Sequence, residues 1–159
     1  MREIKFQAWL GHAMVQVVKL DFMLNAAGDE YINIGVGYFL DGEHKGTPIG
    51  FEMSKVKLRE YTGLHDKNGR EIYEGDIIVD GSVPGPEYGI GGYMFTKYEV
   101  KMVNGCFVVE CIPDCVNDHV FGNYHLLYEV IADGFAEVVG NIYENPELLE
   151  VKTNNHKTV

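Results

Sequence analysis

The stretch that decides the fold is "YTGLHDKNGREIYEGDIIVDG", residues Tyr61–Gly81. Asn68–Gly69 lies near its middle and predicts a β-hairpin, because a type I′ turn needs a positive φ at both central residues. Gly75–Asp76 then interrupts the pattern, and Ile77–Val79 is typical of a buried strand. A Gly-Asp step before a short β-branched run is common where a small barrel bends. The stretch therefore predicts a hairpin followed by a sharp bend of the sheet.

Four acidic residues occur in the same stretch: Asp66, Glu71, Glu74 and Asp76. Paired carboxylates can serve as general acid and base, or hold a divalent metal. Acids on a hairpin are more often solvated, however, and an aspartate suits a turn by itself. The glycines of the stretch also lack the Gly-Lys-Ser/Thr step of a phosphate-binding loop. We therefore interpret the stretch as a structural corner, with its acids as an alternative site for a metal-assisted hydrolase.

The remaining chain is dominated by predicted strands. Ile4, Phe6 and Ala8 alternate with polar neighbours, which predicts a half-buried strand ending near Trp9. The same kind of reasoning predicts strands at residues 15–22, 31–36, 55–60, 93–103, 106–112 and 136–142. Asn104–Gly105 predicts a second hairpin with a two-residue turn. The fold class is therefore mainly β.

Helical spacing occurs only near the C-terminal end. Val120, Tyr124, Leu127 and Ile131 recur every three to four residues, which predicts one short helix near 124–132. Gly134 is expected just past the end of this helix, where a left-handed conformation is common. Asn145 is expected to cap a last helical turn that Pro146 begins and Leu149 ends.

A glycine- and proline-rich segment, "GSVPGPEYGIGG" at residues 81–92, separates two sets of predicted strands. Such composition is typical of a loop or a linker. A length of 159 residues fits one domain or two very small ones. We therefore expect one unit over residues 1–159, or two small β subdomains divided at residues 81–92.

The formal net charge is −11. An acidic surface repels phosphate backbones and anionic lipids, so binding to nucleic acid or to a membrane is not expected. No segment reaches the roughly 20 apolar residues that a membrane helix needs, and the first residues lack a signal sequence. Three cysteines fit a reducing compartment better than a disulfide framework. We expect a cytoplasmic protein.

The cysteines form a candidate metal site. Cys111, Cys115 and His119 have a spacing that could supply three zinc ligands, and Cys106 and His125 lie nearby in the sequence. Zinc needs four convergent ligands, and no second close pair completes the set. Buried thiols that behave as small hydrophobic groups explain the same pattern. We therefore predict no metal, no cofactor and no catalytic residue.

Three stretches together resemble the YopX family, which comprises prophage and phage proteins of Gram-positive bacteria. They are "MREIKFQAW" (1–9), "YTGLHDKNGREIYEGDII" (61–78) and "VVGNIYENPELL" (138–149). The resemblance implies a mostly β fold with small SH3-like barrel or roll character, and it supplies no catalytic residues. The segment between residues 83 and 120 is not part of what is recognised.

These observations lead to one main functional hypothesis and two alternatives. The main hypothesis is an uncharacterised, non-catalytic prophage accessory protein that acts through self-association, as a homo-oligomer, or by binding an unidentified phage or host protein. Its basis is the lack of an assembled active site, together with a sheet-rich body whose edges need partners or protection. The alternatives are a metal-assisted hydrolase and a small barrel that binds nucleic acid.

Overall fold

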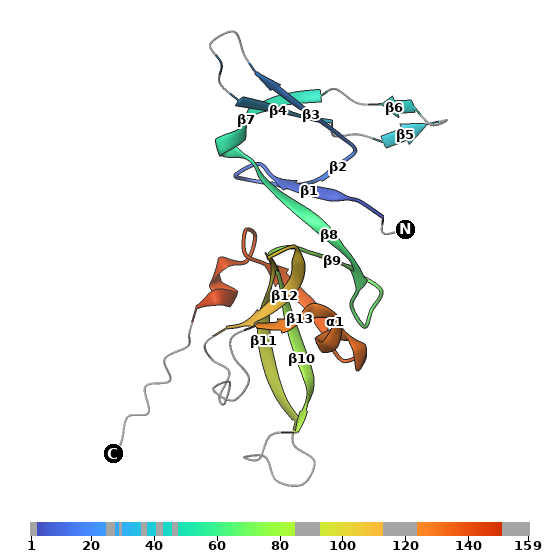
Figure 1. Ribbon diagram of the computed structural model, residues 1–159, viewed down its shortest axis with the longest axis vertical. Helices are drawn as coiled ribbons and strands as arrows, with labels where there is room; N and C mark the ends of the chain where they lie inside the picture. The colour runs from blue at the N-terminus through green and yellow to red at the C-terminus, as the bar shows by residue number, and fades with distance from the viewer. Residues whose placement is uncertain are drawn as a thin grey trace. The chain divides into compact units, whose positions relative to one another are not determined.

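The computed structural model describes residues 3–24, 28, 30–35, 38–40, 43–45, 48–84, 93–112 and 124–150 (Figure 1). The protein is mainly β, as the sequence predicted, and its described strands pair antiparallel. The chain divides into two compact units, Met1–Gly63 and Leu64–Val159. Within the described ranges, no helix is long and apolar enough to cross a membrane.

The N-terminal unit is built of short antiparallel strands. They are β1 (Phe6–Trp9), β2 (Met14–Val17), β3 (Lys19–Leu24), β4 (Glu30–Gly35), β5 (Tyr38–Leu40), β6 (Glu43–Lys45) and β7 (Pro48–Glu52), followed by the 3-10 turn η1 (Met53–Lys55). β3, β4 and β7 form one sheet in that order, and β5 pairs with β6. β1 lies between β2 and β8 (Lys57–His65), and β8 runs through the boundary between the units.

A small apolar cluster stabilises the N-terminal unit. Its fully or nearly fully buried members are Ala8, Ile32, Ile34 and Val56. The predicted alternation in the first strand is confirmed at Ala8, whereas Ile4 precedes β1 and is 70% exposed. The cluster is small, and the apolar side chains that pack around it are only partly buried.

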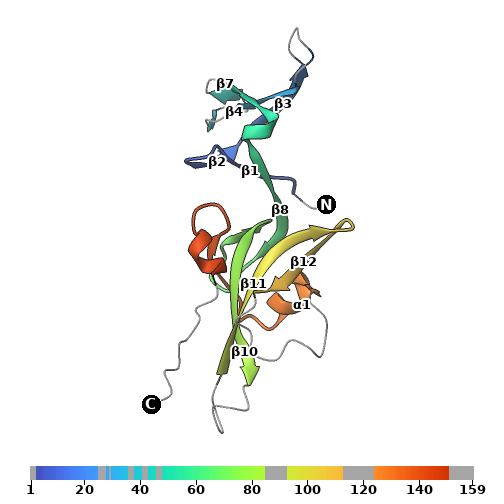
Figure 2. The ribbon, with the colours of Figure 1, turned by 90° about the vertical axis from the view of Figure 1, so that its left-hand side faces the viewer.

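The C-terminal unit contains a five-stranded antiparallel sheet. Its elements are β9 (Glu71–Tyr73), β10 (Asp76–Pro84), β11 (Tyr93–Val103), β12 (Cys106–Cys111), β13 (Tyr124–Leu126), α1 (Leu127–Ala132), β14 (Glu137–Asn141) and the 3-10 turn η3 (Pro146–Leu149). The strand order of the sheet is β13-β12-β11-β10-β14, and β9 pairs with β8. Figure 2 shows β10, β11 and β12 side by side.

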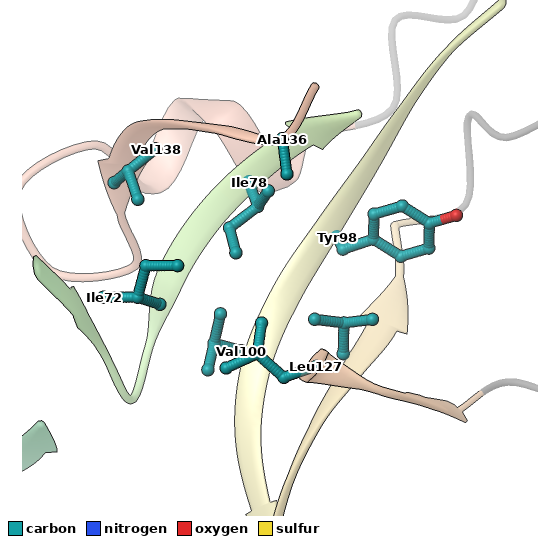
Figure 3. Close-up of a cluster of buried hydrophobic side chains, with 8 residues drawn as sticks. Ile72, Ile78, Tyr98, Val100, Leu127, Ala136 and Val138 are labelled. Carbon is teal, nitrogen blue, oxygen red and sulfur yellow. The ribbon is translucent and has the colours of Figure 1, made fainter. Parts of the chain in front are cut away.

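One face of this sheet carries the larger core of the molecule (Figure 3). The core follows from the register, because Ile78 lies opposite Tyr98 and Val100 lies opposite Val109, so all four point to the same face. The buried members are Ile72, Ile78, Tyr98, Val100, Val109, Leu127, Ala136 and Val138. The strand-period pattern of the sequence thus becomes one apolar face, which α1 covers through Leu127.

Three details differ from the sequence-based expectations. The five-stranded sheet is open, with β13 and β14 at its edges, so the described residues form no closed barrel. Residues 124–126 are a strand because they pair with β12, and the helix begins only at Leu127. Residues 81–84, predicted as part of a loop, continue β10 and pair with β11, and residues 85–92 lie outside the described residues.

The two predicted hairpins have different turns. Asn104 and Gly105 both have positive φ values, 50° and 82°, and Val103 pairs with Cys106, which confirms a two-residue turn. At the other hairpin only Gly69 has a positive φ. There the Asp66 N–H donates to the Arg70 carbonyl and the Gly69 N–H donates to the Asp66 carbonyl, so the predicted type I′ turn is wrong.

The chain reversals near the C-terminal end agree with the sequence in position, but the predicted Asn145 cap is wrong. Gly134 lies just past α1 with a φ of 76°, as predicted. η3 begins at Pro146, but the Asn145 side chain makes no capping hydrogen bond to it. The Asn145 Oδ1 instead accepts a hydrogen bond from the N–H of Asn141, four residues earlier, at 3.3 Å.

Candidate functional site

The acid-rich stretch folds around the side chain of Asp66. Its Oδ1 accepts hydrogen bonds from the N–H groups of Asn68, at 2.8 Å, and Arg70, at 2.9 Å. Its Oδ2 accepts a third from the Val138 N–H at 3.1 Å. Asp66 therefore closes its own turn and holds β14.

The ionisation of Asp66 follows from this arrangement. Burial alone would raise the pKa of the carboxyl group, because it removes water from the charged form. The hydrogen bonds from Val138, Arg70 and Asn68 and the charge of Arg70 outweigh burial and lower the pKa below its ordinary value. A carboxyl group that acts as general acid or base near neutral pH needs a raised pKa, so the lowered pKa of Asp66 fits a structural role.

The other predicted acids also have local partners. Asp76 Oδ2 accepts a hydrogen bond from the Tyr73 N–H at 2.8 Å, which closes the bend before β10. Glu71 Oε2 accepts from the Tyr73 hydroxyl at 2.7 Å. Glu74 is half-buried between them in the sequence. The described part of the chain brings no three His, Cys, Asp or Glu side chains together as a possible metal site.

The closing motif, residues 138–149, contacts the middle motif, residues 61–78. Gly75 donates its N–H to the Val100 carbonyl at 2.8 Å and accepts from the Ile142 N–H at 2.9 Å. Asn141 Oδ1 accepts from the N–H groups of Tyr143 and Glu144, at 3.0 and 2.9 Å. The recognised motifs thus supply the corners and the closing turn of the C-terminal unit.

The predicted cysteine site is only partly within the described residues. Cys106 is exposed, whereas Cys111 is half-buried and packs against the core of the C-terminal unit. The two face opposite sides of β12, as expected for residues five positions apart. Cys115 and His119 lie outside the described residues, so the predicted absence of a metal at these candidate ligands is not tested by the structure.

The outer face of the five-stranded sheet carries a charged group at its centre. Glu99 and Glu110 lie directly opposite each other on β11 and β12. Lys101 Nζ lies 3.2 Å from Glu99 and also hydrogen bonds to Glu110. Burial alone would lower the pKa of Lys101, but the hydrogen bond and charge of Glu110, together with Glu99, raise it. The cation thus relieves repulsion between two facing carboxylates.

Exposed apolar side chains occur on β13, at the edge of this face, and on and just after α1. Tyr124 and Leu126 are each 49% exposed on β13, the last strand in the order. Tyr128, on α1, is 68% exposed, and Phe135 is 54% exposed. We call these four residues the β13–α1 surface. The sequence-based reading missed it because helical spacing hid the alternation of Tyr124 and Leu126 around His125.

The N-terminal unit has an apolar surface of its own. Phe22 and Leu24 on β3 are 64% and 70% exposed. Phe22 lies opposite Ile32, which is fully buried, so Phe22 extends the apolar face of the sheet beyond its covered part. Exposed apolar side chains next to edge strands are typical of contact surfaces between proteins.

Comparison with known proteins finds matches that cover most of the chain. The family model described as "YopX protein" matches residues 5–150. The structure of protein EF1440 from Enterococcus faecalis is 26% identical, covers 94% of this chain and 100% of its own, and gives a TM-score of 0.56.

A second crystal structure, that of protein yopX from Bacillus subtilis, is 22% identical, covers 92% of this chain and 96% of its own, and gives a TM-score of 0.53. At this identity, the likeness concerns the fold. No curated protein matches. The family model covers most of the chain, and this protein therefore belongs to the YopX family.

Proposed function

We propose that this protein is a non-catalytic prophage accessory protein that acts through self-association or by binding another protein. The observation that supports this most is the β13–α1 surface, where Tyr124 and Leu126 are exposed on an edge strand. An edge strand presents unpaired N–H and carbonyl groups, and apolar neighbours add a favourable contact. The prophage context rests on the family resemblance alone.

Two further observations agree with this proposal. The acids of the most recognisable stretch are engaged in closing turns, as Asp66 and Asp76 show. Three cysteines with Cys106 exposed fit a reducing compartment, so we place the protein in the cytoplasm of the bacterial cell.

The proposal is tested by replacing one apolar residue on the surface. Leu126→Lys places a charge on β13, and Val139→Lys makes the same change at an exposed residue of β14, the opposite edge strand. Light scattering over a concentration series reports self-association, and affinity capture from cells with an induced prophage reports other partners. We expect assembly or capture with wild type and with Val139→Lys, and its loss with Leu126→Lys.

The opposite outcome is equally clear. A protein that remains monomeric at all concentrations, and whose captured proteins are the same for wild type and Leu126→Lys, would count against a binding role for this surface. Circular dichroism of both variants checks that each one folds.

A further inference from the structure

The register of the sheet determines what a strand added beyond β13 would meet. Antiparallel partners share a face, so Glu99, Glu110 and Tyr124 form one row across β11, β12 and β13. Lys101, Val108 and Leu126 form the next row. A new strand would lie about 4.8 Å beyond β13 and continue both rows. One of its side chains would therefore face Tyr124, and the side chain two positions away would face Leu126.

The sequence around this edge carries mostly negative charge. No Lys or Arg occurs between residues 102 and 151, so every formal charge in that part of the sequence is negative at neutral pH. Glu129 and Asp133 are exposed on and just after α1, and Glu110 lies in the row of Tyr124. Lys97 and Lys101 lie on the same face of β11, where Lys97 donates to the Leu148 carbonyl and Lys101 contacts two carboxylates. The exposed apolar side chains of β13 are therefore accompanied by negatively charged side chains.

We infer that β13 receives an extended, basic segment of a partner protein as an additional strand; this rests on the proposed function. Its residue opposite Tyr124 is Lys or Arg, which lies over the aromatic ring and is attracted by Glu110. Its residue opposite Leu126 is apolar. The main-chain hydrogen bonds supply affinity, and the alternation of basic and apolar side chains supplies specificity.

A second copy of this chain fits the edge less well. Symmetric pairing brings the same surface patch together twice, so the acidic residues around this edge would be brought near those of the second copy. The net charge of −11 adds repulsion between the copies. A cationic partner gains from the same charges, because complementary potentials speed encounter and favour the correct partner.

The test uses the full chain and a defined probe, a blocked peptide of about ten residues in which lysine and valine alternate at every second position, with threonine between them, so that one face presents lysine and valine in turn. We expect it to bind at about 20 mM salt and to weaken at least about ten-fold at about 200 mM salt, where screening is stronger. Hydrogen exchange should slow at the amides of residues 124–126 on binding. Leu126→Lys should weaken binding about ten-fold or more, whereas Val139→Lys should leave it unchanged.

Two control peptides separate strand addition from simple charge attraction. One has alternate backbone amides methylated, and the other has the same composition with its lysines grouped. Both should bind at least about ten-fold more weakly than the alternating peptide, because they cannot form the ladder or match the rows. Equal binding by either control, or no effect of Leu126→Lys, overturns the inference.

A charge control completes the design. The pair Glu129→Gln and Asp133→Asn should weaken peptide binding more than the pair Glu3→Gln and Glu30→Gln, which removes the same charge from the N-terminal unit. If Leu126→Lys instead abolishes a homodimer and the peptide does not bind, the occupant is a second copy; the inference is then wrong and the proposed function stands. Failure of both peptide binding and Leu126-dependent capture would defeat both.

Discussion

The Asp66 carboxylate accepts a hydrogen bond from the backbone N–H of Val138, at 3.1 Å and across 72 residues of sequence. The same carboxylate holds the N–H groups of Asn68 and Arg70. Lys67 strengthens the junction, since its N–H donates to the Ala136 carbonyl at 3.0 Å and its ammonium pairs with Glu137. One short side chain therefore joins the middle motif to the closing strand of the C-terminal unit.

Replacing Asp66 with Asn should destabilise the C-terminal unit by about 1–3 kcal/mol. The amide has one acceptor oxygen and places an NH₂ donor where the carboxylate accepted a hydrogen bond, so buried N–H groups lose a partner. Urea unfolding followed by circular dichroism measures the change, and hydrogen exchange at Val138 locates it. Asp21→Asn, at an exposed ion pair, is the control, with an expected change below about 0.5 kcal/mol.

The lowered pKa of Asp66 predicts a specific acid dependence. Its stabilisation is complete above the ordinary aspartate pKa, about 4, and is lost as the pH falls through the lower pKa of the folded protein. The unfolding free energy of wild type should therefore decline more steeply below about pH 4 than that of Asp66→Asn. Parallel pH profiles for the two proteins would contradict this role of the carboxylate.

The raised pKa of Lys101 predicts a loss of stability in alkali. The contribution of Lys101 is complete below the ordinary lysine pKa, about 10.5, and is lost as the pH rises through the higher pKa of the folded protein. Lys101→Met should remove this dependence and leave Glu99 facing Glu110. Thermal unfolding between about pH 9 and pH 11 compares the two proteins, and Lys19→Met should behave like wild type.

Gly140→Ala should be destabilising by about 1–3 kcal/mol. A Cβ at this position would lie 2.5 Å from Asn145 Oδ1 and 2.8 Å from Leu148 Cδ1, so the closing turn would have to move. Thermal unfolding measures the loss. Val139→Ala, at the exposed neighbour, should change stability by less than about 0.5 kcal/mol. Equal effects of the two changes would show that the close approach at Gly140 is unimportant.

The two hairpin asparagines should respond differently to alanine. Asn104 has a φ of 50°, a left-handed conformation in which alanine is strained by about 1 kcal/mol. Asn68 is exposed and does not have a positive φ, so Asn68→Ala should be nearly neutral. Chemical denaturation of both variants decides the matter. A larger loss for Asn68→Ala would restore the type I′ turn that the sequence suggested.

Much of the candidate site was not predictable from local sequence. Tyr124 and Leu126 have a spacing that fits both a helix and a strand, and β12 decides between them by pairing with β13. Val139 is exposed because the pairing of β10 and β14 shifts register beside it. The exposure of an apolar residue depends on which strand lies at the edge of a sheet, and no single segment of the sequence determines the strand order.

The sequence by itself determined the local elements. Alternation gave the strands of the core, Asn104–Gly105 gave a two-residue turn, and Gly134 and Pro146 marked a helix end and a helix start, because each depends on the conformational preferences of a few adjacent residues. The tertiary structure decided the conformation of Asn68 and the open edge at β13. The edge depends on pairing between strands distant in sequence, and the turn at Asn68 is closed by the Asp66 carboxylate, which also accepts from the distant Val138 N–H; local propensity cannot specify those distant partners.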